Sequence, residues 1–221
     1  MDPSSRADLA ALQQRIAERP AQLPDIVARL STDVASFSGS DLADIAYYLG
    51  KLHGHHPGLF DHMSHRSIQD DNHDLIVDLA ETFAAQRAML ANMTVEAGPA
   101  TTLAGEYNAV KTIEQLRTAI DVLGQSDRQG CGMGAAIALL SDWIIWRPAL
   151  NALATRLAIP VPDSEMQDMQ KRLLASLENR AEPRELRAIS FGLEQLYHQH
   201  DQFWLLLERR QKLRNTMLRS V

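Results

Sequence analysis

The stretch S-D-R-Q-G-C-G-M-G-A-A-I-A-L-L-S-D-W-I-I-W-R, residues 126–147, decides how the rest of this chain is organised. It holds the only cysteine, Cys131, two of the three tryptophans and the longest weakly polar run. Such a run is typical of a helix that is buried on most of its sides. The run from Gly130 to Trp146 is short for a membrane span and includes Asp142 and three glycines, so the sequence predicts a core helix.

The same stretch predicts where this helix begins and which of its faces carries small residues. Ser126 and Gln129 have the spacing of a capping box, which predicts a helix that begins there and continues through Pro148, with a kink, to about residue 158. Small residues recur at steps of four, at Gly130, Gly134 and Ala138. This stripe would let a neighbouring helix approach closely. No strand precedes the glycines and no Lys-Ser/Thr follows them, so they do not form a phosphate loop.

The rest of the chain has apolar residues at spacings of three and four, which indicates helices throughout. The expected helices cover roughly residues 5–19, 24–37, 41–53, 58–65, 72–96, 106–123, 127–158, 164–178 and 183–214. Long helices with short links favour antiparallel neighbours. The predicted fold is therefore all-α, a single domain over 1–221. It is an up-and-down helical bundle of ferritin-like character at 70–217, with N-terminal helices of 1–66 packed on it.

Composition limits the classes of partner. The chain has 221 residues, a net charge of −6 and a pI near 5.7, which argue against nucleic acid because phosphate binding needs a positive surface. One cysteine excludes an internal disulfide and suits a reducing compartment. The first residues, M-D-P-S-S-R-A-D, lack the pattern of a signal peptide. We therefore expect a soluble, cytoplasmic protein that binds neither membrane nor nucleic acid.

One basic run departs from this acidic balance near the C-terminal end. Its members are Arg209, Arg210, Lys212, Arg214 and Arg219. Cations near the end of a helix complement the helix dipole, and we assign that role to them.

Histidines are concentrated in one region, since six of the eight lie between His53 and His73. Imidazole and carboxylate side chains together suit zinc, iron or manganese. If 58–65 is helical, Asp61 and His65 lie one turn apart on one face. The candidate metal ligands are His53, His55, His56, Asp61, His62 and His65, with Glu194 and His198 if this turn folds onto the last helix. The alternative is a solvated, histidine-rich turn at a helix C-terminus.

Known metal motifs are absent from the sequence. There is no H-E-x-x-H and no Cys/His finger spacing. Ferritin-like di-iron proteins use Glu-x-x-His on two helices, and this chain has none. The nearest approaches are Glu194-x-x-x-His198 and Asp70-x-x-His73. A standard di-iron centre is therefore not expected.

Three polar residues fall on stripes that should be buried. Gln86 lies in the apolar stripe of 72–96, and His200 lies between Leu196 and Phe203 in the last helix. Asp142 follows A-I-A-L-L, and a buried carboxylate needs a partner, for which Arg128, Arg147 and Arg187 are the candidates. Gln86, Asp142 and His200 are also the residues predicted to face a ligand, if the bundle core contains a pocket.

Three strings resemble those of a known family. They are L-H-G-H-H-P-G (52–58), A-G-P-A-T-T-L-A-G (97–105) and S-D-R-Q-G-C-G-M-G-A-A-I-A-L-L-S-D-W (126–143). The chain is similar to an uncharacterised helical protein family of sphingomonad-type alphaproteobacteria. The resemblance implies a bacterial, intracellular setting and brings no activity or site.

Two hypotheses for function follow. The first is a non-catalytic helical protein that binds a partner or a small ligand and self-associates, because no complete catalytic motif is present. Its expected partner is another protein chain or a second copy. The alternative is a metal-dependent, oxidoreductase-like bundle protein that uses the His53–His65 cluster with iron or zinc. A divalent metal is the only cofactor that the sequence suggests.

Overall fold

The computed structural model describes residues 3–66, 72–100, 102–103, 105–163, 165–178 and 182–218. Over these residues the chain is helical and has no strand, which confirms the all-α class. Asp70 and Arg219 lie outside the described residues. The α-helices are α1 (Pro3–Glu18), α2 (Asp25–Thr32), α3 (Gly39–His53), α4 (Leu59–Arg66), α5 (His73–Ala97), α6 (Glu106–Gly124), α7 (Cys131–Arg156), α8 (Met166–Glu178) and α9 (Pro183–Leu218). Two 3-10 helices, η1 (Arg19–Gln22) and η2 (Val34–Ser36), flank α2.

Helix α7 is the centre of the fold, as its sequence predicts. It packs against α2, α4, α6, α8 and α9, and both of its tryptophans, Trp143 and Trp146, are fully buried. It also continues through Pro148. The predicted start at Ser126 is wrong, because Gly130 has a φ of +92° and the helix begins only at Cys131. A left-handed backbone at that position suits glycine and ends the preceding turn.

Helices α7 and α9 approach so closely that glycine is required on both of them. A Cβ on Gly134 would collide with the carbonyl oxygen of Ile189, and a Cβ on Gly192 would collide with that of Cys131. This contact confirms that the small stripe of α7 serves close helix packing. Gly192 supplies the matching gap on α9.

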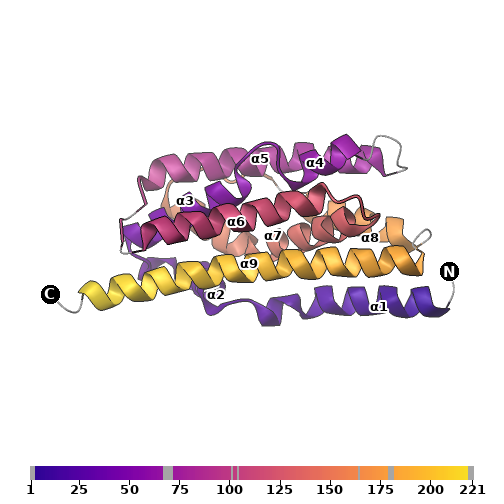
Figure 1. Cartoon of the computed structure of the whole chain (residues 1–221). Helices are drawn as coiled ribbons and strands as arrows, with labels where there is room; N and C mark the ends of the chain where they lie inside the picture. The colour runs from indigo at the N-terminus through magenta and orange to yellow at the C-terminus, as the bar shows by residue number, and fades with distance from the viewer. Residues whose placement is uncertain are drawn as a thin grey trace.

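The molecule is an elongated helical bundle (Figure 1). Helix α9 runs along it, with α1 packed against α9 on one side and α5 on the opposite side of the bundle. Helix α3 packs against α5, α6 and α9, and α4 against α5, α6 and α7. The N-terminal α3 thus contributes fully buried residues to the core, among them Tyr48, Leu49 and Leu52. In the part of the chain that the structure describes, no helix is long and apolar enough to cross a membrane.

Candidate functional site

Four polar side chains form a continuous chain of hydrogen bonds in the middle of the bundle. Arg19 donates from Nε to Oδ1 of Asp142 at 2.8 Å and from Nη2 to Oδ2 at 2.9 Å. Nδ1 of His200 lies 2.7 Å from the same Oδ2. Nε2 of His200 then lies 3.0 Å from Nε2 of His53. The chain joins η1, α7, α9 and α3, so it ties together segments from the whole sequence.

The order of this chain fixes where its protons lie. An ionised carboxylate only accepts hydrogen bonds, so His200 carries a proton on Nδ1 and donates it to Asp142. With His200 neutral, its Nε2 is an acceptor and Nε2 of His53 is the donor. One proton therefore lies between the two facing imidazoles.

The surroundings of the two histidines are aromatic and closed to bulk solvent. The ring of His53 lies 5.6 Å from that of Trp143, and the ring of His200 lies 4.5 Å from that of Trp146. His53 is 5% exposed, while His200 and Asp142 are 0% exposed. Burial, followed by the nearby His200 and His55, holds the pKa of His53 well below its usual value. His53 is therefore neutral in the folded protein at neutral pH.

Arg19 is the cation that makes burial of Asp142 acceptable. Burial alone would lower the pKa of Arg19, but hydrogen bonds and charges from Asp142 and Asp201 raise it above its usual value. Its Nη2 lies 2.8 Å from Oδ1 of Asp201, and its guanidinium lies 4.3 Å from the ring centre of Tyr197. Burial in the same place raises the pKa of Tyr197 to about 12. Arg19 is thus permanently charged and paired with carboxylates.

The predicted partners of Asp142 are therefore wrong, because its partner is Arg19. Of the three arginines considered, Arg147 instead donates to Oε1 of Gln86 at 3.1 Å and to the carbonyl oxygen of Pro162. Oε1 of Gln86 also accepts from Nε1 of Trp143 at 3.2 Å. Of the residues predicted to face a core ligand, Asp142 and His200 contact each other, whereas Gln86 bonds Trp143 and Arg147. All three are 0% exposed.

The histidine-rich turn is dispersed rather than convergent. His55 Nε2 lies 3.0 Å from Oδ1 of Asp121 on α6, and His62 lies 3.8 Å from the same oxygen and beside Gln125. His53 points away from both, into the core. The turn thus docks α4 and its preceding loop onto α6, through a carboxylate that was not among the predicted ligands.

The remaining candidate ligands have other partners. Asp61 is held by Arg87, whose Nη1 lies 2.8 Å from Oδ2, with His56 at 3.3 Å. Nδ1 of His65 bonds the carbonyl oxygen of Asp61 at 2.6 Å. On α9, Glu194 pairs with Arg15, and His198 is exposed. Over the described ranges, no three His, Cys, Asp or Glu side chains are grouped so that they could hold a metal ion. The geometry does not favour the metal-dependent alternative.

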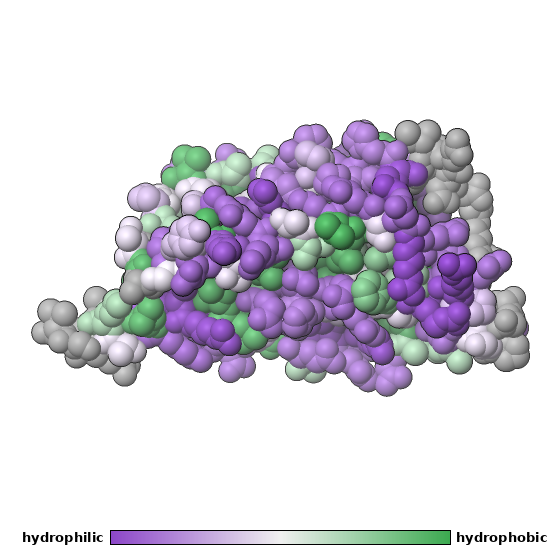
Figure 2. Space-filling view, in the orientation of Figure 1, coloured by the Kyte–Doolittle hydropathy of each residue, from purple (hydrophilic) through white to green (hydrophobic). Residues whose placement is uncertain are grey.

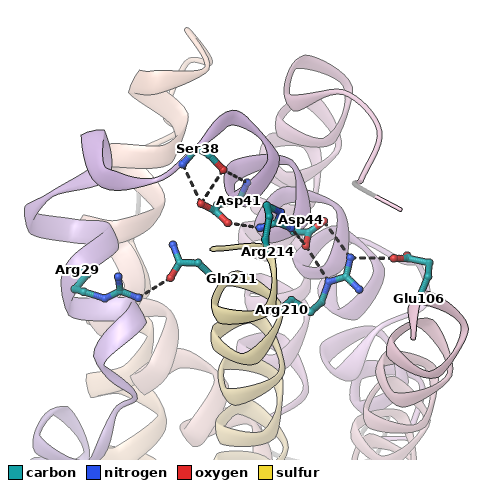
Figure 3. Close-up of polar contacts among 8 residues, drawn as sticks. All are labelled: Arg29, Ser38, Asp41, Asp44, Glu106, Arg210, Gln211 and Arg214. Atoms are coloured by element: carbon teal, nitrogen blue, oxygen red, sulfur yellow. Dashed lines mark hydrogen bonds and ion pairs between the residues drawn. The ribbon is translucent and has the colours of Figure 1, made fainter. Parts of the chain in front are cut away.

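A second buried polar network lies where the C-terminal half of α9 meets the start of α3 (Figure 3). Arg210 Nε lies 2.8 Å from Oδ2 of Asp44, and its Nη2 lies 2.9 Å from Oε2 of Glu106. Arg214 pairs with both Asp41 and Asp44. Part of the basic run of α9 is thus buried in ion pairs. The predicted role, compensation of the helix dipole, does not account for these pairs.

The cap of α3 belongs to the same network. Ser38 accepts a hydrogen bond from the backbone of Asp41, and Asp41 accepts one from the backbone of Ser38, as in a capping box. Arg29 on α2 donates to Gln211 at 2.7 Å (Figure 3). Asp41 therefore both caps its own helix and binds α9 through Arg214.

An open groove of about 680 Å³ runs between α6 and α9. Figure 2 shows this face, where apolar residues stand among hydrophilic ones. The groove is lined by Lys111, Glu114, Gln115, Thr118, Ala119, Val122, Leu123, Phe191, Gln195 and Gln199. Two of its apolar side chains are exposed, Val122 at 58% and Phe191 at 43%. Exposed apolar groups beside polar ones are typical of interaction surfaces.

Comparison with known proteins gives one match. No curated protein and no solved structure matches the chain. The model of a family of unknown function, DUF6975, matches residues 16–215, which include both buried networks and the groove. By that match the chain belongs to DUF6975.

Proposed function

We propose that this chain is a non-catalytic helical protein that acts by association, and that the groove between α6 and α9 receives the same groove of a second copy. The observation that carries the proposal is the chemistry of the groove, whose amides and charged groups have no partner among the described residues and can pair with the same groups of a second copy. The proposed setting is a bacterial cytoplasm, with which the single, buried Cys131 is compatible.

The sealed centre of the molecule supports a non-catalytic role. A general acid or base must reach the proton that it transfers, within hydrogen-bond distance or through one water. Arg19, Asp142, His200 and His53 are at most 5% exposed and bond each other. We therefore assign this chain of side chains to the specificity of helix packing.

The polar groups of the groove are suited to a second copy. The side-chain amides of Gln115, Gln195 and Gln199 make no hydrogen bond within the described residues. An amide both donates and accepts, so it pairs with another amide. Lys111 and Glu114 form no ion pair within the described residues, and their side chains carry opposite charges. A surface that meets its own copy must carry matching groups of this kind.

The apolar groups of the groove provide the desolvated centre of such a contact. Phe191 is held in place by Arg128, whose guanidinium lies 5.3 Å from its ring centre. A two-fold axis through the groove would bring Phe191 of each copy near Val122 and Leu123 of the other. Stable interfaces bury about 800 Å² on each partner, so the contact must extend along the exposed faces of both helices.

The test is the oligomeric state in solution, measured by sedimentation equilibrium over a wide range of concentrations. We expect a monomer–dimer equilibrium that Val122→Glu and Phe191→Glu each weaken by at least ~10-fold, because each would bury an unpaired carboxylate at the contact. Val95→Glu is the matched control, since Val95 is 76% exposed but lies outside the groove. A chain that stays monomeric at high concentration, or a control that weakens association equally, overturns the proposal.

A further inference from the structure

We propose that the facing imidazoles of His53 and His200 form an acid-sensitive lock, in which uptake of a second proton separates the end of α3 from α9 and opens the bundle. The opening does not depend on the proposed self-association. Only its consequence for the groove rests on that proposal.

The lock follows from the number of protons that the pair can hold. The two Nε2 atoms lie 3.0 Å apart and share one proton when both rings are neutral. Protonation of one ring still leaves a donor facing an acceptor. Protonation of both places N–H against N–H, and two cations then lie with ring centres 5.0 Å apart. Like charges at this distance and shielded from bulk solvent repel strongly.

The charged groups around the pair cannot compensate two cations. From η1, Arg19 contributes a positive charge and occupies both oxygens of Asp142 from α7. Asp201 on α9 is also paired with Arg19. From α5 and α7, the ring of His53 lies near the rings of Phe83, Trp143 and Trp146, none of which is charged. On its own segment, His55 is a further titratable group and is bound to Asp121 of α6.

The position of His53 decides which part opens. It is the last residue of α3, whereas Asp142 binds both Arg19 and His200 directly. The other end of α3 is anchored to α9 by the ion pairs of Asp41 and Asp44. Separation therefore begins at the His53 end of α3. Because α3 packs against α6, which forms one wall of the groove, opening would also disturb that wall.

The pH range follows from the lowered pKa of His53. The open state binds the proton more readily than the closed state. The closed state is therefore fully favoured above the usual histidine pKa of ~6.5 and loses stability as the pH falls toward the lower pKa of the folded protein. Over that window, the ratio of open to closed molecules should rise by up to ~10-fold per pH unit for one proton.

The tryptophans provide the readout. All three tryptophans of the chain lie in this cluster, since the ring of Trp146 is 5.3 Å from that of Trp204 and 6.0 Å from that of Trp143. Tryptophan emission is recorded from about pH 8 to about pH 4, across the usual histidine value. Hydrogen exchange of the α3 amides is measured over the same range. We expect both to report opening with a midpoint below ~6.5.

The decisive variant is His53→Gln, in which an amide replaces the ring, bonds His200 and does not titrate. We expect its acid midpoint to move to lower pH by about one unit. His198→Gln is the matched control, because His198 is an exposed histidine of α9, and it should leave the midpoint unchanged. Equal midpoints in the wild type and both variants overturn the lock.

Two further measurements keep the proposal testable if a variant fails to fold or if the protein is monomeric. If His53→Gln does not fold, histidine-ring NMR of the wild type decides, because the lock requires that His53 and His200 are not both cationic before the α3 amides exchange. Double protonation of His53 and His200 in a closed bundle contradicts it. If Val122→Glu is monomeric and keeps the acid transition, the lock stands. If the wild type also proves monomeric, only the proposed self-association fails.

Discussion

The guanidinium of Arg19 is paired with the carboxylate of Asp142 by two hydrogen bonds of 2.8 and 2.9 Å, although 123 positions separate them in the sequence. Both side chains are buried, at 1% and 0% exposure. Neither charge could be placed in this core alone, so the pair specifies how η1 docks on α7.

Removal of the cation should be strongly destabilising. Arg19→Met leaves the charge of Asp142 uncompensated, and we expect the free energy of unfolding to fall by ~3–5 kcal/mol. The double variant Arg19→Met/Asp142→Leu should recover part of this loss, because apolar replacement of a whole buried pair is much less costly. Urea denaturation of both variants measures the difference. A double variant less stable than Arg19→Met contradicts the assignment.

The control for that experiment is Arg15→Met. Arg15 pairs with Glu194, but both side chains are 49% exposed, and exposed pairs contribute little to stability. We expect almost no change in the urea midpoint. A loss comparable to that of Arg19→Met would mean that burial is not what distinguishes the two pairs.

The close contact between α7 and α9 predicts a large effect of a single methyl group. Gly134→Ala places a Cβ against the carbonyl oxygen of Ile189, and neither backbone can move without shifting its helix. Overpacking of this kind costs ~1–3 kcal/mol or more, which thermal denaturation would show as a lower Tm. Gly39→Ala is the control, because a Cβ there meets nothing within 4 Å. Its Tm should be unchanged or higher.

The helices could be predicted from sequence because apolar periodicity is a local property. The partners of the buried polar side chains could not be predicted, because they lie on segments that are distant in the sequence and meet only in the folded chain. A local signal was nevertheless present. Arg19 continues the stripe of Leu12 and Ile16, and Arg210 and Arg214 continue that of Phe203 and Leu207. Charged residues in register with a buried stripe indicate buried pairs, which the reading of the basic run as dipole compensation missed.

The histidines that are close in the sequence do not come together in the structure. His53 ends α3 and turns inward, whereas His55 and His62 follow on a loop and another helix and meet Asp121. Neighbours in the sequence point in different directions once a helix ends. Only Asp142 and His200, 58 positions apart, were both predicted as buried polar residues and found in contact.

The second network predicts how the end of α9 is held. Asp44→Ala removes the shared partner of Arg210 and Arg214, and both cations are then left with one carboxylate each among the contacts described above. We expect a loss of about 3 kcal/mol, together with faster hydrogen exchange in α9 beyond Leu207. Asp168→Ala is the control, because Asp168 pairs with Lys171 at the surface, where both side chains are 76% exposed. Unchanged exchange in α9 contradicts a structural role for Asp44.

Metal ions should leave the stability of this protein unchanged. A bound ion would raise the Tm by mass action in proportion to its concentration over its Kd. Asp61, the buried carboxylate of the histidine-rich turn, is already neutralised by Arg87, whose Nη1 lies 2.8 Å away, so a cation would have to displace a fixed guanidinium. We therefore expect the Tm of untagged protein to be the same with added Zn²⁺, Fe²⁺ or Mn²⁺ and with a chelator. A stoichiometric metal content, or a rise in Tm that Asp121→Asn abolishes, would show that His55 and His62 do bind an ion.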